Sequence, residues 1–171
     1  MPDFPLGEPA PDFSDPIGLL EACHSRIAEN CELLQRMCDH QDAHGADDEL
    51  ITAAHRVMRY FDLAAPLHHA DEEQDLFPAL AGGADLAPLI TRLQAEHDEH
   101  EALWQGLRKE LMIIVAGRRS TLLRQRVEPF TKAYLEHAEI ENRQILPQAR
   151  QILDSNTLAR IGASMARRRQ G

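Results

Sequence analysis

The chain has 171 residues, which suits one domain of ordinary size, and 18 basic against 28 acidic side chains give it a formal net charge of −10. This charge argues against a basic face for nucleic acid, and no apolar run approaches the length of about eighteen residues that a membrane span needs. The three cysteines crowd between Cys23 and Cys38, which fits neither a disulfide framework nor a CxxC motif and favours a reducing compartment. We therefore expect a soluble, cytoplasmic protein with neither nucleic acid nor a membrane as its partner.

Hydrophobic periodicity predicts an all-α protein. Valine appears only three times and alternating runs of strand length are lacking, whereas apolar residues recur at steps of three and four. Four long stripes of this kind, separated by short polar stretches, predict an antiparallel up-down four-helix bundle with a short fifth helix at the C-terminus. We expect an extended N-terminal arm over 1–15, the bundle over 16–150, and a short helix with a basic tail over 151–171.

The first expected helix begins at residue 16, after the N-capping pair Ser14 and Asp15, and ends near 38–40 before a polar loop over 41–45. The second begins at the acidic stretch 47–49, bends without ending at Pro66, and ends near 77–78. The buried stripes comprise Leu20, His24, Ile27, Cys31, Leu34 and Cys38 in the first helix, and Met58, Phe61, Ala65, His68, Glu72 and Leu76 in the second.

The third expected helix runs from about 84 to 115 and stops at Gly117, and the fourth ends shortly after Pro147. Their stripes comprise Leu93, His97, His100, Trp104, Leu107 and Leu111, and then Val127, Phe130, Tyr134, His137, Glu141 and Ile145. A short fifth helix, capped over 155–157, turns Leu158, Ile161 and Met165 inward. The arginines at 167–169 are expected to form a frayed tail.

The two halves of the sequence resemble each other, which indicates a repeated helix pair. At an offset of 69 positions His68 matches His137, Glu72 matches Glu141 and Pro78 matches Pro147, and at an offset of 73 His24 matches His97. A bundle with this repeat brings one inward histidine from each of four helices, and one inward carboxylate from each of two, towards a common level.

These inward residues have the pattern of a metal site. Side chains four positions apart project from the same helix face, so His-x3-Glu can hold a single centre, and two such helices can serve two centres. Imidazole and carboxylate suit iron, manganese or zinc, whereas burying unpaired carboxylates without a metal is costly. The candidate ligands are His24, His68, Glu72, His97, His137 and Glu141.

The segment 68–78 resembles the second-helix signature of the hemerythrin-like HHE cation-binding domains, in which a histidine is followed by paired glutamates and then by Leu-Phe-Pro. Glu96-His97 and His137-x3-Glu141 resemble two further elements of that family, and His24 stands at its first-helix ligand position. The resemblance covers about residues 16–150. It implies a non-haem, oxo- or hydroxo-bridged centre of two iron ions (Fe2+/Fe3+) with both glutamates bridging and the histidines terminal; manganese and zinc are the alternatives.

The chain also departs from part of that family. Oxygen-carrying hemerythrins supply five histidines and end their site with His-x4-Asp, whereas this chain has His-x3-Glu, which argues against a carrier role. His100, three residues from His97 on the buried stripe, is a candidate fifth histidine ligand or a ligand at the entry to the site. His69 and Glu73 lie about 100° round the helix from His68 and Glu72, so they are expected to face solvent or to support the ligands. The histidines without site spacing, His40, His44 and His55, are expected at the surface.

The leading functional interpretation is a di-iron protein that binds or senses oxygen, nitric oxide or peroxide, or that buffers iron. One alternative is an enzyme that repairs iron–sulfur centres or consumes peroxide or nitric oxide, and whether there is turnover is open. Another is a metal-free or zinc-bound helical interaction module, because zinc outranks iron in intrinsic affinity. The expected partner is a small diatomic molecule or peroxide, and monomer and homodimer are both open.

Overall fold

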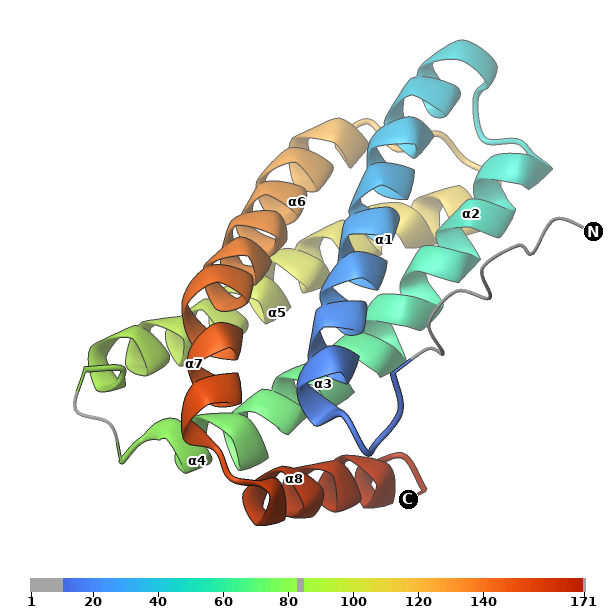
Figure 1. The fold of residues 1–171 in the computed structure, drawn as a ribbon. Helices are drawn as coiled ribbons and strands as arrows, with labels where there is room; N and C mark the ends of the chain where they lie inside the picture. The colour runs from blue at the N-terminus through green and yellow to red at the C-terminus, as the bar shows by residue number, and fades with distance from the viewer. Residues whose placement is uncertain (1–10, 83–84, 171) are drawn as a thin grey trace, which may run out of the picture.

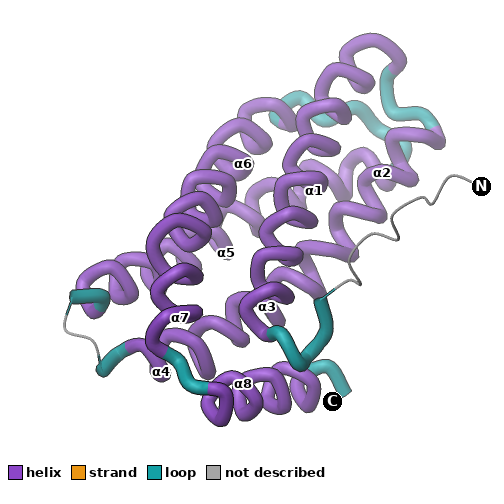
Figure 2. Tube along the Cα trace, in the orientation of Figure 1, coloured by secondary structure: helices purple, strands orange, loops and turns teal. Residues whose placement is uncertain are grey.

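A computed structural model describes residues 11–82 and 85–170. Every regular element in these ranges is helical, which confirms the all-α prediction (Figure 2). Four long helical rods run alternately up and down beside one another, as an antiparallel bundle requires (Figure 1). The short helix α8 (Ser155–Arg168) lies across the end of the bundle at which the first rod begins, against α1 and the second rod.

The rods are built as follows. The first is α1 (Pro16–His44), and the third is α5 (Ala87–Val115). The second consists of α2 (Asp48–Arg59), the π-helical turn η1 (Tyr60–Ala64), α3 (Ala65–Asp71), the π-helical turn η2 (Glu72–Leu76) and α4 (Phe77–Leu80). The fourth consists of α6 (Leu123–Ile140), the π-helical turn η3 (Glu141–Ile145) and α7 (Leu146–Ile152).

The first helix is longer than its sequence predicts, because the stretch expected as a loop over 41–45 is helical as far as His44. Gln41 points inward at this turn: its Nε2 donates to the backbone oxygen of Ser120 at 3.0 Å, and its Oε1 accepts the N–H of the same residue at 2.8 Å. A buried polar partner thus stabilises a turn that looks like a loop by composition. Gly45, with φ of 80°, ends the helix where a residue with a side chain would be strained.

The third helix begins at Ala87 rather than near 84. Pro88 occupies its first turn, where the helix uses no backbone N–H donor, so a proline is tolerated there. Gly83 and Ala84 lie outside the described residues, as do residues 1–10 of the expected N-terminal arm. None of the described helices combines the length and the apolarity that crossing a bilayer demands.

Three prolines each follow a π-helical turn by the same spacing. The N–H of Ala65 bonds to the oxygen of Tyr60, that of Phe77 to Glu72, and that of Leu146 to Glu141, and the next residues are Pro66, Pro78 and Pro147. A proline in an α-helix clashes with the carbonyl four residues earlier and cannot donate to it. The wider π-helical turn before each proline relieves this clash. The second rod therefore continues through Pro66, as predicted.

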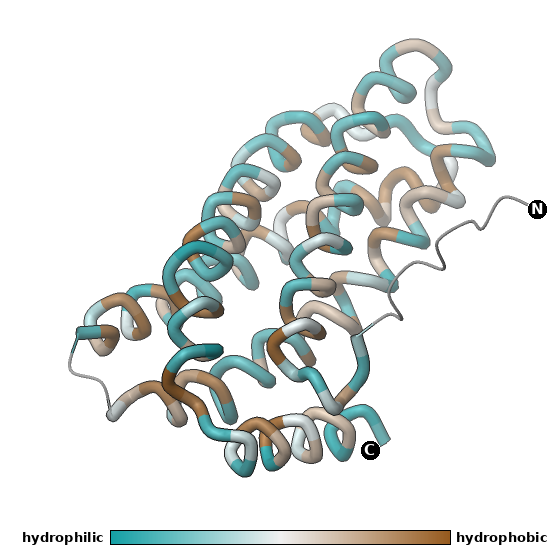
Figure 3. Tube along the Cα trace, in the orientation of Figure 1, coloured by the Kyte–Doolittle hydropathy of each residue, from teal (hydrophilic) through white to brown (hydrophobic). Residues whose placement is uncertain are grey.

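The apolar core is divided into two clusters with a polar layer between them. The larger cluster includes Leu34, Trp104 and Phe130, and the smaller includes Leu20 and Phe77 together with Ile161 and Met165 of α8. Hydropathy alternates along each rod, so that hydrophobic residues recur at helical spacing (Figure 3). The candidate ligands belong to neither cluster and lie on the same stripes, which places them in the polar layer.

The sequence predicts a frayed tail for the C-terminal arginines, and the structure does not have one. Arg168 ends α8 and pairs with Asp71 and, at 2.8 Å, with Asp75; Arg169 pairs with Asp71 at 2.6 Å. Asp71 is completely buried, so it needs these charges to offset its desolvation. The ion pairs fasten α8 to the second rod directly beside Glu72.

Candidate metal centre

Each rod sends one histidine into the polar layer, and the second and fourth rods each add a glutamate. The six side chains are His24 from α1, His68 from α3, Glu72 from η2, His97 from α5, His137 from α6 and Glu141 from η3. None of them is more than 4% exposed. The structure thus brings together six of the seven candidate ligands.

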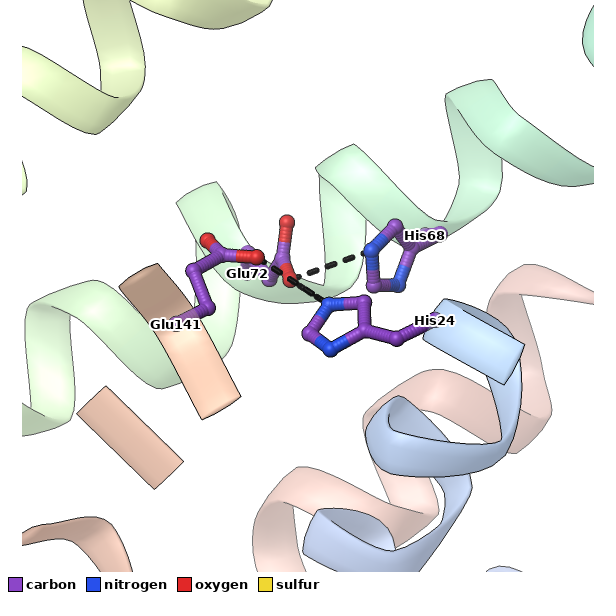
Figure 4. A group of neighbouring side chains, drawn as sticks. All are labelled: His24, His68, Glu72 and Glu141. Carbon is purple, nitrogen blue, oxygen red and sulfur yellow. Dashed lines mark ion pairs between the residues drawn. The ribbon is translucent and has the colours of Figure 1, made fainter. Parts of the chain in front are cut away.

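One histidine pair faces one oxygen of each carboxylate. Nε2 of His68 lies 3.2 Å from Oε1 of Glu72, and Nε2 of His24 lies 3.6 Å from that oxygen and 3.1 Å from Oε2 of Glu141. Figure 4 shows these four side chains converging from three rods. Their ligand atoms lie within 4.8 Å of one another, as an ion bound by all four would require.

The second histidine pair faces the other oxygen of each carboxylate. Nε2 of His97 lies 3.4 Å from Oε2 of Glu72, and Nε2 of His137 lies 3.2 Å from Oε1 of Glu141. The two Nε2 atoms are 3.1 Å apart. Together with the glutamates these histidines form a second group of ligand atoms within 4.8 Å. The two groups overlap only in Glu72 and Glu141, so each carboxylate is shared between two histidine pairs.

The donor set fits two cations. Both oxygens of Glu72, both oxygens of Glu141 and Nε2 of His24 are buried and lack a hydrogen bond within the described residues. Buried carboxylates without partners are costly, and cations between them remove that cost. Imidazole with shared carboxylate is a donor chemistry that first-row metal ions accept. The arrangement therefore suits a binuclear metal site.

Outer hydrogen bonds orient three of the four imidazoles. Nδ1 of His97 donates to Oε1 of Glu73 at 2.6 Å, and Nδ1 of His137 donates to Oε2 of Glu96 at 2.8 Å. Nδ1 of His24 donates to Oδ1 of Asn142 at 2.7 Å. A proton held on Nδ1 leaves the lone pair of Nε2 free for a metal, so these bonds set the tautomer that ligation needs.

The metal-free site holds protons where cations would lie. Burial alone would lower the pKa of His24, but its close contacts with Glu141 and Glu72 and the negative charges of these carboxylates outweigh burial and raise the pKa to about 10. Burial would lower the pKa of His97 as well, but its contacts, chiefly with the Glu72 carboxylate, outweigh burial and raise the pKa to about 9. Burial opposes ionisation of Glu72 as well, yet the neighbouring histidines lower its pKa well below the usual range. The Glu72 carboxylate is thus ionised and ready to bind cations.

Two further histidines lie beside the second group without joining it. His100 packs flat on Tyr134, with ring centroids 4.1 Å apart, and its ring lies 4.8 Å from that of His137. His69 stacks on His97 at 3.9 Å. Burial and the nearby imidazoles lower the pKa of His100 to about 3 and that of His69 to about 2, so both rings are neutral. Neither group of ligand atoms includes His100, so the structure adds no support to its predicted ligation.

Sequence reasoning placed some outer residues and missed others. Glu73 was expected to face solvent or support a ligand, and it supports His97. Asn142 was missed because its partner, His24, lies 118 residues away. Glu96 was noted only as part of a motif, and its bond to His137 crosses between the third and fourth rods. His55 and His44 are exposed as expected, and the partly buried His40 bonds to Asp47 away from the site.

A polar cavity of about 230 Å³ reaches the second group from outside. Its lining includes His97, His69, Glu73, Tyr134 and Trp104. Nε2 of His69 is buried and has no hydrogen-bond partner within the described residues. The cavity thus gives a small polar molecule access to the side of one ligand group.

Comparison with known proteins agrees with this geometry. Residues 15–149 match the family described as hemerythrin HHE cation binding domain. The chain is also 30% identical over 159 residues to a protein of Haemophilus influenzae that is described only as uncharacterised, and the match covers 92% of each chain. The family match spans all six converging ligands.

Proposed function

The chain belongs to the hemerythrin HHE cation-binding domain family, and we propose that it is a non-haem di-iron protein whose centre binds or senses oxygen, nitric oxide or peroxide. His24 and His68 would hold one ion, His97 and His137 the other, and Glu72 and Glu141 would be shared. A bound pair of iron ions supplies one-electron redox change at each ion and positions at which a small ligand can bind. The observation that carries the proposal is the polar cavity beside the His97–His137 group, because its lining includes His97 and so offers a small molecule a place next to a proposed ligand.

The residues around the cavity have definable tasks. Glu73 and Glu96 hold the protons on Nδ1 of His97 and His137 and so keep these rings aimed inward. His69 is neutral and offers an unpartnered Nε2, which can exchange a hydrogen bond with a small molecule in the cavity. Trp104 and Phe61 form the apolar part of the lining, which limits the water that reaches the site.

Optical spectra test the proposal directly. Protein purified anaerobically and loaded with Fe(II) should show new charge-transfer bands when exposed to oxygen, nitric oxide or peroxide. His69→Leu, which removes a cavity side chain outside both ligand groups, should keep its iron and alter the decay of those bands. Iron that is bound and released without any spectral response to the three molecules would favour iron buffering over binding or sensing.

An enzyme that consumes peroxide or nitric oxide is the second candidate. Each ligand group offers four donor side chains and omits His100, which leaves both ions short of the six ligands of octahedral coordination. Two accessible ions favour turnover over reversible binding at one. Repeated additions of peroxide to a small amount of loaded protein distinguish the two: an enzyme consumes each addition, whereas a sensor reacts once per centre.

A zinc-bound or metal-free interaction module is the remaining alternative. It would bind zinc or no metal after expression in iron-rich medium and would show no visible absorption with any of the three molecules. The metal content of the purified protein decides between this reading and the first two.

A further inference from the structure

A second cavity, of about 470 Å³, lies between α1 and the second rod on a face that shares no lining residue with the polar cavity. One part of its wall is formed by Arg26, Arg56 and Arg59, and another by Tyr60, Leu63 and Leu67. We call it the arginine cavity. Its volume lies within the range of about 300 to 1,000 Å³ that is usual for small-molecule sites.

The positive charge of this cavity is not neutralised by the protein. None of the three arginines forms an ion pair with a carboxylate among the described residues, although the chain carries ten more acidic than basic side chains. Among the described residues the guanidinium of Arg26 makes one hydrogen bond, to the sulfur of Cys23 at 3.6 Å, and Glu29 is the one acidic residue in the lining. Guanidinium groups present planar pairs of donors that match a carboxylate or a phosphate, so the unpaired cluster favours an anion.

Another part of the wall is apolar and comes largely from the first π-helical turn. Leu63 lies within η1 and is 60% exposed. Tyr60, at the start of the same turn, is held by a hydrogen bond of 3.3 Å from its hydroxyl to the backbone oxygen of Cys23. An apolar body in the cavity would cover Leu63 and gain the free energy of removing that surface from water.

Asn30 adds an unpartnered acceptor to the wall. It is 5% exposed, and its Nδ2 donates to the backbone oxygen of Arg26 at 2.8 Å. Its Oδ1 is buried and has no partner within the described residues. A buried polar atom without a partner is rare in a folded protein, and Asn30 is a lining residue of the cavity, so its Oδ1 lies close to where a donor could approach.

We propose that the arginine cavity binds an organic carboxylate with an apolar body, at a site separate from the metal centre. The carboxylate would pair with Arg56 and Arg59, the apolar body would cover Leu63, and a hydroxyl of the ligand or a bridging water would donate to Asn30. This goes beyond the proposed function, because the anion would bind whether or not the centre reacts with oxygen, nitric oxide or peroxide.

Calorimetric titration of the full, metal-loaded chain tests the proposal with three probes of equal chain length. Octanoate should bind at least about tenfold more tightly than 1-octanol, because only the anion pairs with the guanidinium groups. Arg59→Gln should weaken octanoate binding about tenfold, and Glu29→Gln should tighten it about threefold by removing the acid from the lining. Arg36→Gln is the matched control, since Arg36 is exposed on α1 outside the cavity.

Equal binding of octanol and octanoate would overturn the proposal, as would unchanged octanoate binding by a folded Arg59→Gln variant. Equal weakening by Arg36→Gln would show general charge attraction and would also overturn it. Binding of octyl phosphate without octanoate would refute the carboxylate assignment. Metal content and circular dichroism of the same samples separate these outcomes from a failure of the metal centre or of folding.

Discussion

Glu72 and Glu141 occupy the same place in two π-helical turns: each is the first residue of its turn, and the carbonyl oxygen of each accepts the N–H of the residue five positions later. Their carboxylates meet in the polar layer, where each carboxylate directs one oxygen to one histidine pair and its other oxygen to the other pair. The sequence repeat is therefore also a repeat of backbone geometry. π-helical turns within α-helices occur frequently at functional sites, and here they begin at the two shared ligands.

This equivalence predicts equal effects of two substitutions. Glu72→Gln and Glu141→Gln should each lower the metal content to one ion per chain or fewer, because each carboxylate serves both ligand groups. Glu73→Gln should keep two ions with metal affinity about 10- to 100-fold weaker, since Glu73 only orients His97. Elemental analysis after anaerobic loading measures all three. Equal metal loss from Glu73→Gln would mean that Glu73 is itself a ligand.

His100→Ala is expected to keep both ions and to oxidise in air at a rate close to that of the unaltered protein. The reason is that the His100 ring packs against Tyr134 and its nitrogens belong to neither ligand group. Metal content and stopped-flow spectra of the di-ferrous protein in oxygenated buffer test this. Loss of an ion, or much faster oxidation, would make His100 a fifth histidine ligand after all.

Metal binding should release protons near neutral pH. In the metal-free protein the carboxylates raise the pKa of His24 to about 10 and that of His97 to about 9, and they raise the pKa of His137 as well. His24 and His97 hold protons at pH 7.5 that ligation must displace, so about two protons should leave per pair of ions. Anaerobic Fe(II) titrations in two buffers of different ionisation enthalpy count them. A heat of binding that is independent of the buffer contradicts the expectation.

The same pKa shifts predict how metal changes stability with pH. A raised pKa stabilises the folded metal-free protein fully below the unfolded value of about 6.5, and this stabilisation is lost as the pH rises towards 9 and 10. Metal-loaded protein lacks these protons and should not lose stability in this way. The difference in melting temperature between the two forms should therefore widen from pH 6 to pH 9. A constant or narrowing difference would show that the histidines are not protonated in the metal-free fold.

The attachment of α8 can be tested through Asp71. Asp71→Asn should lower the free energy of unfolding by about 2 kcal/mol, which is less than a fully buried pair would lose because Arg168 and Arg169 remain partly exposed. Asp75→Asn is the matched control: among the described residues Asp75 pairs with Arg168 alone, and its side chain is 15% exposed, so a smaller loss is expected. Urea unfolding of metal-loaded protein measures both. A larger loss for Asp75→Asn would contradict the central role of Asp71.

The helices and the convergence of the six ligands follow from local patterns, whereas the features that hold the ligands in place do not. Apolar residues three and four positions apart place His24 and His97 on buried helix faces. The sequence repeat at an offset of 69 matches Glu72 with Glu141 without any knowledge of tertiary contacts. The bonds from His24 to Asn142 and from His137 to Glu96 join different rods, so periodicity carries no trace of them. Gln41 resembles a loop residue by composition for the same reason, since its partner Ser120 lies on the connection between α5 and α6.

The π-helical turns are an intermediate case. A fixed period of 3.6 hides them, yet Pro66, Pro78 and Pro147 each lie six residues after the start of a turn. Proline alone is not a sufficient signal, because Pro129 lies inside α6 without such a turn.

The central claim is that one chain holds two metal ions between two histidine pairs that share Glu72 and Glu141. The most direct measurement is the iron content per chain of protein loaded anaerobically with Fe(II), freed of unbound metal and analysed by mass spectrometry of the elements. The structure predicts two iron ions per chain, falling to one or fewer in Glu141→Gln. A plateau at one ion in the unaltered protein, or two ions in the Glu141→Gln variant, would contradict the claim.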